Sequence, residues 1–578
     1  MKNILHQILI RYRSSFLMLW VFSIFFNLLV LTMPLYMLAV FSNVLTSRSQ
    51  DTLVLLTVAA TLALVIQGLL DFIRSRLLIR VGASLDADLT PHVLESIIRH
   101  AAGSAQRNAQ RLRDAVKLRT FLTGPTIFTL FDLPFAPLYV LGIYLLHPAL
   151  GALSLFGCLG LLGIALVNEW LTRAPIEGAL KYNRHAQSRV EEFVRNADAI
   201  EAMGMMPAVR HEWQRSNNDS LAALTSGSDS ASVTRGLAKF VRVMLQVGIY
   251  ALGAYLYLQN EIMVGAIMAA SMLMARALSP LETMITTWKS MVEAWDSYKR
   301  IKEVLDPKRL STYTNRMVMP VPAGRLQLER VVVAAPGTDR LTLKGVSFGL
   351  EPGEFLGIVG PSGAGKSTLA KAIVGIISPR SGSARLDGVD LSSWHSDDLG
   401  AHIGYLPQDV QLFSGTVREN IARLGENVDS QAVLQAAEMV GLHDTILQLP
   451  KGYDSDIGEA GAFLSAGQRQ HLGLARALYG NPRLLVLDEP NSNLDSVSEE
   501  ALLKTMDEAK KKGITLVVIT HRPSILRAAD KLLMLNNGTV ELFGPREQVM
   551  RKLTPSKPAR PEAPVTAQPR LQAVQGEN

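Results

Sequence analysis

The sequence predicts a multidomain fold, in which an all-α transmembrane domain of six helices precedes an α/β domain. Three observations predict it: six long apolar stretches in the first half, β-branched runs alternating with helical patterns in the second, and a glycine-rich loop that ends in Lys-Ser. The 578 residues are too many for one compact domain, because domains are typically about 100–200 residues long.

The composition excludes several classes of protein. The chain is 48% hydrophobic and 19% charged, whereas soluble proteins carry about 25% charged residues, and its mean hydropathy is +0.19. These values exclude a disordered chain and argue against a wholly soluble one. The single cysteine, Cys158, excludes intrachain disulfides, a C-x-x-C redox pair and a metal site built from cysteines.

The six apolar stretches are each long enough to cross a bilayer, which takes about 20 residues of helix. A buried core helix is the alternative for any one of them, but six stretches in three close pairs favour membrane spans. The first is too long for a cleaved signal peptide and has no small-residue cleavage pattern behind it. We expect a transmembrane domain over residues 1–305, with spans near 16–45, 53–73, 126–146, 149–170, 238–258 and 262–284.

The net charge of +7 lies in this hydrophobic half. Residues 1–305 contain 28 basic and 21 acidic side chains, whereas residues 306–578 contain 30 of each. The long segments 74–125 and 171–237 are rich in arginine, while the short connectors within the pairs contain one basic residue, Arg48. The positive-inside rule then places the long segments and both termini in the cytoplasm. Nucleic-acid binding is an alternative explanation, but membrane orientation accounts for the arginines with fewer assumptions, and we expect no nucleic-acid partner.

The long segments have apolar residues at helical spacing and are expected to extend the membrane helices, each turning at a short connecting helix. Some polar residues lie within or near the spans: Asp132, Asn168, Glu169, Arg242 and Arg276. Intramembrane charge is costly and usually faces a cavity or a partner. Most of these residues lie near expected cytoplasmic ends, but Asp132 and Arg276 are candidates for lining a pathway. Pro134 and Pro137 predict a kink in the third span.

The second domain is expected over residues 325–553, after a polar linker at 306–324 and before a tail at 554–578 whose composition predicts disorder. The apolar strand FLGIVG leads into GPSGAGKS and then into a helical pattern, which is the G-x-x-x-x-G-K-S loop in its strand–loop–helix setting. Backbone N–H groups and the helix N-terminus of such a loop surround phosphates. The predicted phosphate-binding residues are Gly360, Pro361, Ser362, Gly363, Ala364, Gly365, Lys366, Ser367 and Thr368.

The loop assigns separate tasks to its last residues. Lys366 would neutralise the β- and γ-phosphates of a nucleotide, and Ser367 would supply a hydroxyl to Mg²⁺. A second apolar strand, LLVL, ends in Asp488 and Glu489. Asp488 is placed to hold Mg²⁺ directly or through water, and Glu489 to polarise an attacking water.

The segment LSAGQRQ at 464–470 resembles the signature of ATP-binding cassette (ABC) proteins, and it precedes LLVLDEP in that family's order. The resemblance implies that Ser465, Gly467 and Gln468 contact the nucleotide bound by a second cassette. One cassette and six spans per chain therefore imply a homodimer that binds ATP and Mg²⁺. A glycine of the family's signature is Ala466 here.

Other cassette elements follow the same resemblance. Gln408 resembles the glutamine that contacts Mg²⁺, and His521 resembles the switch histidine at the γ-phosphate, which acts with Glu489 in hydrolysis. Residues 493–495 resemble the loop that crosses the dimer interface, and 456–461 an acidic loop near the membrane domain. Many cassettes stack adenine on an aromatic side chain where this chain has Ala334 and Ala335, so no adenine-contacting residue is assigned.

Six spans ahead of one cassette resemble an ABC exporter half-transporter. The run FDLPFAPLYVLGIYLLHP, the start almost directly at the first span and the aromatic-free VVVAAPG resemble the permease/ATPase subunit of bacterial type I secretion systems, the protease and lipase exporters. That resemblance implies export of an unfolded protein across the inner membrane, with a periplasmic membrane-fusion adaptor, an outer-membrane channel protein and membrane lipid as partners. A lipid or drug exporter is the alternative, and a membrane ATP sensor that transports nothing is a remoter one.

Overall fold

The computed structural model describes residues 4–103, 110–305, 319–335, 338–492 and 496–553. Two compact units form, one largely from the helices up to α12 and one from the elements β1 to α22, and each is treated by itself. The predicted tail at 554–578 and residues 306–318 of the predicted linker lie outside the described residues.

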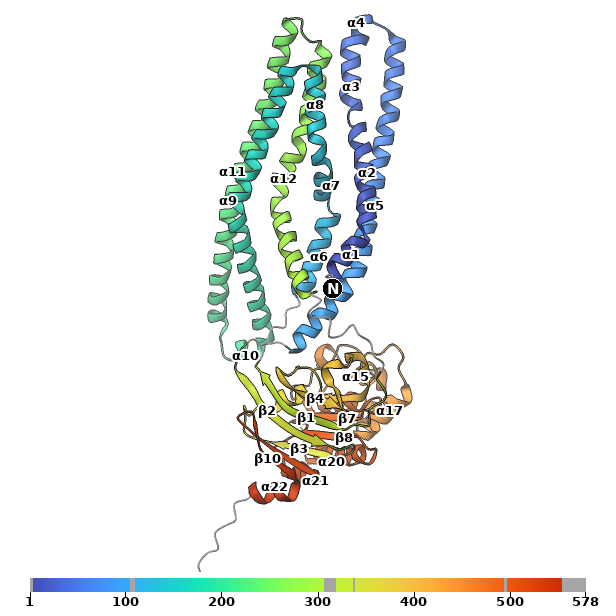
Figure 1. Cartoon of the computed structure of the whole chain (residues 1–578), viewed down its shortest axis with the longest axis vertical. Coiled ribbons are helices and arrows are strands. Elements are labelled where there is room, and N and C mark those ends of the chain that lie inside the picture. The colour runs from blue at the N-terminus through green and yellow to red at the C-terminus, as the bar shows by residue number, and fades with distance from the viewer. Residues whose placement is uncertain (1–3, 104–109, 306–318, 336–337, 493–495, 554–578) are drawn as a thin grey trace, which may run out of the picture. The chain divides into compact units, whose positions relative to one another are not determined.

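The first unit is all helical (Figure 1). Within the described residues, six helical stretches are long and apolar enough to cross a membrane, and each overlaps one predicted span: Arg13–Ser47, Gln50–Arg99, Thr126–Leu146, Pro148–Arg195, Met206–Leu258 and Val264–Val304. The fold-class prediction is confirmed for this unit. Its helices are α1 (Ile4–Arg11), α2 (Arg13–Leu29), α3 (Thr32–Ala39), α4 (Leu45–Ser47), α5 (Gln50–Gly103), α6 (Gln110–Thr123), α7 (Pro125–Asp132), α8 (Ala136–Leu146), α9 (Pro148–Arg195), α10 (Ala197–Ala202), α11 (Met206–Leu258) and α12 (Val264–Val304).

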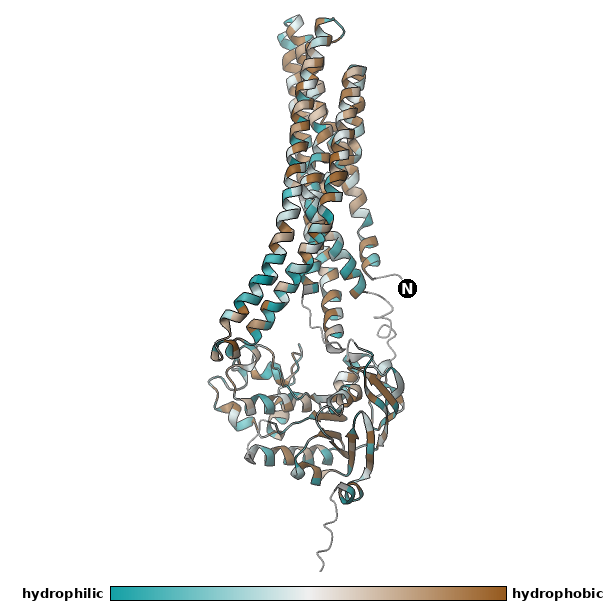
Figure 2. Ribbon diagram, turned by 90° about the vertical axis from the view of Figure 1, so that its left-hand side faces the viewer, coloured by the Kyte–Doolittle hydropathy of each residue, from teal (hydrophilic) through white to brown (hydrophobic). Residues whose placement is uncertain are grey.

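The predicted helical extensions are present. α5, α9 and α11 each continue well beyond their apolar stretch, and the short helix α10 connects α9 to α11, as expected. The third span is interrupted by a 3-10 turn at Leu133–Phe135, which contains Pro134 and separates α7 from α8. Figure 2 shows apolar residues along the upper part of the helices and more polar residues toward their lower ends.

α9 and α11 pack closely along their length, and small residues make this approach possible. A Cβ on Gly157 of α9 would lie 2.6 Å from Leu245 Cδ1 of α11. Further along, a Cβ on Gly227 would lie 3.3 Å from Pro175 Cβ. Helices in a bilayer gain little from excluding water, so close van der Waals packing at small residues contributes much of their association.

The second unit is an α/β domain with two sheets, and it confirms the predicted fold class. A six-stranded sheet has the order β10-β9-β3-β8-β7-β6, and a four-stranded antiparallel sheet has the order β2-β1-β4-β5. The strands are β1 (Leu326–Ala334), β2 (Leu341–Leu350), β3 (Phe355–Val359), β4 (Ser381–Leu386), β5 (Val389–Asp390), β6 (Ile403–Leu406), β7 (Leu484–Asp488), β8 (Thr515–Ile519), β9 (Lys531–Asn536) and β10 (Thr539–Pro545).

Helices flank the six-stranded sheet: α14 (Lys366–Ile373), α15 (Ser396–His402), α16 (Val417–Ile421), α17 (Ser430–Met439), α18 (His443–Leu447), α19 (Ala466–Leu478), α20 (Ser496–Lys511), α21 (Pro523–Ala528) and α22 (Arg546–Leu553). Alternate residues of each central strand enter different cores. On β7, Leu485 and Leu487 join one cluster, while Leu484 and Val486 join the other. Both faces of the sheet are therefore covered, as the continuous apolar runs of a parallel sheet require.

Candidate functional site

The predicted site residues follow strands that are neighbours in the sheet. β3, β8, β7 and β6 are parallel and adjacent in that order, so their carboxyl ends meet at one edge. The phosphate loop follows β3, His521 follows β8, Glu489 follows β7, and Gln408 follows β6. The carboxyl edge of a parallel sheet is where such folds bind ligands. The topology therefore brings four separate motifs to one place.

The phosphate loop connects β3 to the first turn of α14. Gly363 and Gly365 have φ angles of +78° and +102°, which glycine adopts readily and other residues rarely do. At Gly360, a Cβ would lie 2.2 Å from Leu535 O, so only glycine fits there. Lys366 begins α14, and its Nζ donates to Gly360 O at 2.8 Å and Pro361 O at 3.0 Å. The ammonium is thus held over the loop, where a phosphate group would lie.

Ser367 and Thr368 occupy the first turn of the same helix, and Ala364 is buried beneath the loop. Pro361, Ser362 and Gly363 are exposed. Free N–H groups at a helix N-terminus attract anions. The loop therefore presents an exposed rim, a helix terminus and one ammonium on the same side of the sheet.

Asp488 ends β7 with a side chain that is almost fully buried, 2% exposed. It is hydrogen-bonded to the Ser367 side chain. Burial is the main cause that raises the pKa of this carboxyl; the Ser367 hydrogen bond opposes the shift, and the charge of Glu489 adds to it. Asp488 also acts on its neighbour: burial first, and then the charge of Asp488, raise the pKa of Tyr405 to about 12.

The donor set at Asp488 suits Mg²⁺. Asp488 Oδ1 is buried and has no hydrogen-bond partner among the described residues. An unpaired buried carboxylate oxygen beside a hydroxyl is a place for a hard cation with oxygen ligands. The described residues contain no cluster of three or more His, Cys, Asp or Glu side chains of metal-binding kind. Mg²⁺ is commonly held by one or two carboxylates with phosphates and waters completing its shell, so the residues present fit this ion.

Glu489 has a strained backbone that aims its side chain at the site. Its φ is +51°, a left-handed conformation that costs a residue with a Cβ about 1–2 kcal/mol. Its N–H donates to Ile519 O at 2.9 Å, which fastens it to β8. Gln408 Nε2 donates to Glu489 Oε2 at 2.9 Å, and His521 Nε2 lies 3.8 Å from Glu489 Oε1. The structure thus brings Gln408, Glu489 and His521 together.

Gln470 is a positioning residue that the sequence did not reveal. Its side chain is buried, and its carboxamide donates to Pro490 O and, at 3.4 Å, to Glu489 O. It therefore holds the backbone immediately after the candidate base. The available signal was its helical spacing to the buried Gly473, Leu474 and Ala477, which places Gln470 on the inner face of α19.

Among the described residues, no hydrogen bond or ion pair joins Ser465 or Gln468 to the phosphate loop of the same chain. Ser465 caps α19: its Oγ accepts from Gln468 N at 3.2 Å, and Gln468 Oε1 accepts from Ser465 N at 2.9 Å. Gly467 lies in the first turn of that helix. Ser465 and Gln468 thus satisfy each other in a capping box at the N-terminus of α19. Their predicted contact with nucleotide stays a prediction.

Three further predictions have different outcomes. Residues 493–495, predicted to cross a dimer interface, lie outside the described residues. In the acidic loop, Asp456 Oδ1 accepts from Gly458 N at 2.9 Å. Ala334 ends β1, and Ala335 N donates to Arg340 O at 2.8 Å. Neither alanine has an aromatic ring on which adenine could stack.

In the membrane unit, Asp132 is paired. Its Oδ1 accepts from Asn27 Nδ2 at 2.8 Å and lies 3.4 Å from Arg74 Nη1. Arg74, grouped by sequence with the basic residues of segment 74–125, is instead buried between helices, with its guanidinium over Phe26 and Phe128. Arg276 is exposed. A pathway role for Asp132 or Arg276 stays a prediction.

Comparison with known protein families gives matches in both halves. The ABC transporter family matches residues 343–492, and the ABC transporter transmembrane region matches residues 16–281. The type I secretion system ATP-binding protein PrsD of Rhizobium meliloti (strain 1021) is 40% identical over 540 residues, which cover 93% of this chain and 92% of PrsD. The toxin RTX-I translocation ATP-binding protein of Actinobacillus pleuropneumoniae is 28% identical over 546 residues, covering 94% of this chain and 77% of that protein.

A solved structure has the same fold. The structure of a bacterial Atm1-family ABC exporter with ATP bound superposes with a TM-score of 0.79. It is 22% identical in sequence, and the match covers 94% of this chain and 97% of the other. The likeness therefore extends over both the helical unit and the α/β unit.

Proposed function

Because this chain belongs to the ABC transporter family, as a multi-pass membrane exporter that couples ATP hydrolysis to transport, we propose that it exports an unfolded protein as the permease/ATPase of a type I secretion system. The observation that carries the proposal is the gathering of the phosphate loop, Asp488, Glu489, Gln408 and His521 at adjacent strand ends, in a chain that also contains six spans. The relatives' own cargoes, toxins among them, support a polypeptide over a lipid or a drug.

The proposed site chemistry follows from the positions of the side chains. Lys366 and the N–H groups of the phosphate loop hold the β- and γ-phosphates of ATP. Ser367, Asp488 and Gln408 would hold Mg²⁺, and the bound ion would neutralise charge on the phosphates. Glu489 polarises the attacking water, and His521, which lies 3.8 Å from its carboxylate, orients the γ-phosphate.

The proposed transporter is a homodimer of two chains. Ser465, Gly467 and Gln468 lie at the open N-terminus of α19, whose dipole favours an anion. We place the γ-phosphate held by a second chain there, so that ATP binding joins two cassettes into a homodimer. We place the cassettes and both termini in the cytoplasm, which the arginine-rich long segments support, and the spans in the bacterial inner membrane, which the similarity to type I secretion proteins supports. A periplasmic adaptor and an outer-membrane channel protein complete the export path.

Glu489→Gln tests the assignment of the base. The full-length dimer in nanodiscs should keep its affinity for ATP and lose about 10²–10⁴-fold in hydrolysis rate, because a general base typically contributes that factor. The rate is measured as phosphate release, and retained ATP by filter binding. Glu500→Gln, which removes an exposed carboxylate on α20, serves as a control that should hydrolyse normally. Normal hydrolysis by Glu489→Gln would show that another group acts as the base.

The cargo is tested separately. ATP hydrolysis by the wild-type dimer should respond to the C-terminal segment of a protein secreted by the same cell, and not to added lipid or drug. A response to lipid alone would assign the chain to the lipid exporters, and no response to any transported class would favour a membrane ATP sensor.

A further inference from the structure

Phe463 is the most exposed large apolar side chain in the described part of the cassette, at 74%. Two other exposed aromatic rings there have partners within the unit: Phe413 lies 5.4 Å from the Arg476 guanidinium, and Phe543 lies 5.9 Å from Phe348. Among the described residues, Phe463 stacks on no ring or guanidinium. Its ring surface is therefore available to a partner from outside the chain.

The local backbone fixes the place of this ring. Phe463 N donates to Ile457 O at 3.1 Å, and Leu464 N donates to Gly461 O at 3.0 Å. A Cβ on Gly458 would lie 3.0 Å from Phe463 Cε2, so one edge of the ring passes closely over this glycine. These contacts hold the ring directly before the N-terminus of α19, with most of its surface facing outward.

That N-terminus is where the proposed function places the γ-phosphate of an ATP held by a second chain. Ala466, the first residue of α19, comes three residues after Phe463, and three residues of chain span up to about 10 Å. The ribose and triphosphate of ATP separate the base from the γ-phosphate by a comparable length. Phe463 is thus within reach of the base of a nucleotide whose γ-phosphate lies at this helix.

The start of β2 is an apolar surface beside the phosphate loop of the same chain. A Cβ on Gly365 would lie 3.0 Å from Thr342 O and 3.1 Å from Leu343 Cδ2, so this strand begins against the loop. Leu341 and Leu343 share one face of the strand, because side chains alternate along it. Leu343 is buried, whereas Leu341 is 39% exposed. Leu341 therefore continues the face that covers the loop outward to solvent.

This surface contains no aromatic ring for a base. Ala334 and Ala335 end the preceding strand, and the described residues 338–341 are Thr, Asp, Arg and Leu. Stacking on an aromatic side chain typically strengthens the binding of a base about tenfold. Leu341 can cover a base through apolar contact, but it has no π-face. A ring supplied by a second chain would complete the contact.

We propose that Phe463 of one chain stacks on the base of the ATP whose phosphates the other chain holds, and that Leu341 of that other chain covers the base from its own side. The proposal rests on the proposed function, because it requires two cassettes closed around ATP. The base is then gripped only in the closed dimer, and an open cassette holds ATP mainly by its phosphates. Stacking accepts the face of any base, so GTP gains from Phe463 as ATP does.

Mixed dimers in nanodiscs, purified through a different affinity tag on each chain, assign the ring to one chain or the other. One chain carries Lys366→Ala, so only its partner's phosphate loop is intact, and both chains carry Glu489→Gln to prevent hydrolysis. Phe463→Ala in the Lys366→Ala chain should weaken ATP and GTP binding about tenfold, measured by isothermal titration calorimetry. The same change in the chain with the intact loop should have no effect. Leu341→Ala should weaken binding only in the chain with the intact loop.

Tripolyphosphate with Mg²⁺, which has no base, is the comparison ligand, and its affinity should not change with Phe463→Ala in either chain. Phe463→Trp keeps a ring and should keep ATP affinity. Leu447→Ala removes an exposed apolar side chain from α18 and should change the affinity of neither ligand. Ser465→Ala in the Lys366→Ala chain should weaken both ligands, because it tests the proposed contact with the γ-phosphate.

Three results overturn the proposal. Phe463→Ala could leave ATP binding unchanged, or weaken it only in the chain with the intact loop. It could also weaken ATP and tripolyphosphate equally, which would show that the ring packs against protein and not against a base. If Ser465→Ala in the Lys366→Ala chain has no effect on either ligand, the two-chain site of the proposed function itself fails.

Discussion

The cassette and the membrane unit differ in how their buried charged side chains are paired. In the cassette, Asp488 keeps one buried carboxylate oxygen without a hydrogen-bond partner among the described residues, and Lys366 reaches only carbonyls of its own loop. In the membrane unit, Arg74 is paired with Asp132, and Arg300 with Asp114. The buried oxygen of Asp488 is open to a cation. The ion pairs Arg74–Asp132 and Arg300–Asp114 instead join separate helices and fix how they pack, although Arg74 Nε has no hydrogen-bond partner among the described residues.

The two units also differ in what surrounds their apolar side chains. The central strands of the cassette are buried on both faces, so water exclusion stabilises them. The membrane helices expose large apolar side chains, such as Trp170 at 80% and Phe156 at 74%. In a bilayer these surfaces face lipid and gain nothing from burial, so the paired polar groups and small-residue contacts carry more of the specificity.

Arg74→Gln should give the largest effect and tests the packing side of this comparison. The change leaves Asp132 partly buried with Asn27 as its remaining close partner, and breaking one side of a buried pair typically costs about 3–5 kcal/mol. We expect a markedly lower midpoint of thermal unfolding for the full chain in nanodiscs. Arg76→Gln removes the same charge two residues away on an exposed position and should change the midpoint little.

A second change completes this test. Replacing both partners, Arg74→Leu with Asp132→Leu, should restore much of the lost stability, because no uncompensated charge remains. If Arg74→Gln were as stable as Arg76→Gln, the pair would not hold the helices together. Asp132 would then return as a candidate for the transport pathway.

The same contrast explains what could be predicted from the sequence. Gln408, Glu489 and His521 each lie within two residues of a strand end, so strand patterns and motif order placed them at one edge without any knowledge of side-chain contacts. Arg74 and Asp132 lie 58 positions apart on helices, and Asp114 and Arg300 lie 186 apart. Which faces of long helices meet depends on packing that a single sequence does not specify, so Arg74 was grouped with the basic residues of a cytoplasmic segment.

Asp488→Asn tests whether the buried charge of Asp488 lowers the stability of the nucleotide-free cassette. Burial raises the pKa of Asp488, so the ionised form is disfavoured in the folded, nucleotide-free cassette. Removing that charge should raise the midpoint of cassette unfolding by about 2–4 °C for each 1 kcal/mol gained, while ATP hydrolysis is lost. Scanning fluorimetry without nucleotide or Mg²⁺ measures the first effect, and phosphate release measures the second.

The pH dependence of this gain has a definite sign. A carboxyl whose folded pKa is raised contributes stability that is present below its ordinary pKa and lost as the pH rises through the raised value. At neutral pH the wild-type cassette therefore lacks the stability that a protonated Asp488 would contribute, whereas the uncharged side chain of Asp488→Asn causes no such loss. The difference between the two midpoints should shrink as the pH is lowered through the raised pKa. A constant difference across that window would show that charge is not its cause.

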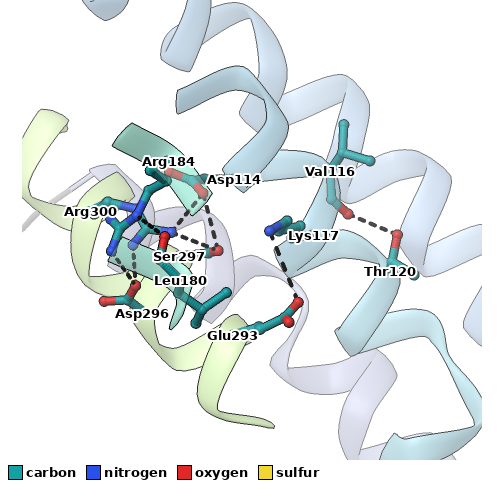
Figure 3. Close-up of polar contacts among 10 residues, drawn as sticks. All are labelled: Asp114, Val116, Lys117, Thr120, Leu180, Arg184, Glu293, Asp296, Ser297 and Arg300. Carbon is teal, nitrogen blue, oxygen red and sulfur yellow. Dashed lines mark hydrogen bonds and ion pairs between the residues drawn. The ribbon is translucent and has the colours of Figure 1, made fainter. Parts of the chain in front are cut away.

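Arg184→Gln should give the smallest effect, because Asp296 has two arginine partners. Arg184 on α9 lies 3.5 Å from Asp296 Oδ2, while Arg300 contacts the same carboxylate from its own helix (Figure 3). Without the Arg184 guanidinium, Asp296 stays paired with Arg300, so the loss is that of one ion pair about one-third exposed, about 0.2–1 kcal/mol. The measurement is the distance distribution between spin labels at positions 182 and 289 in a Cys158→Ala background, with Lys181→Gln as the equal-charge control. We expect Arg184→Gln to raise the population of wider distances by up to about fivefold, and more so at low salt, where exposed pairs are strongest. A shift far beyond that factor would mean that Asp296 depends on Arg184 as Asp132 depends on Arg74, so that this ion pair also fixes how α9 packs against α12.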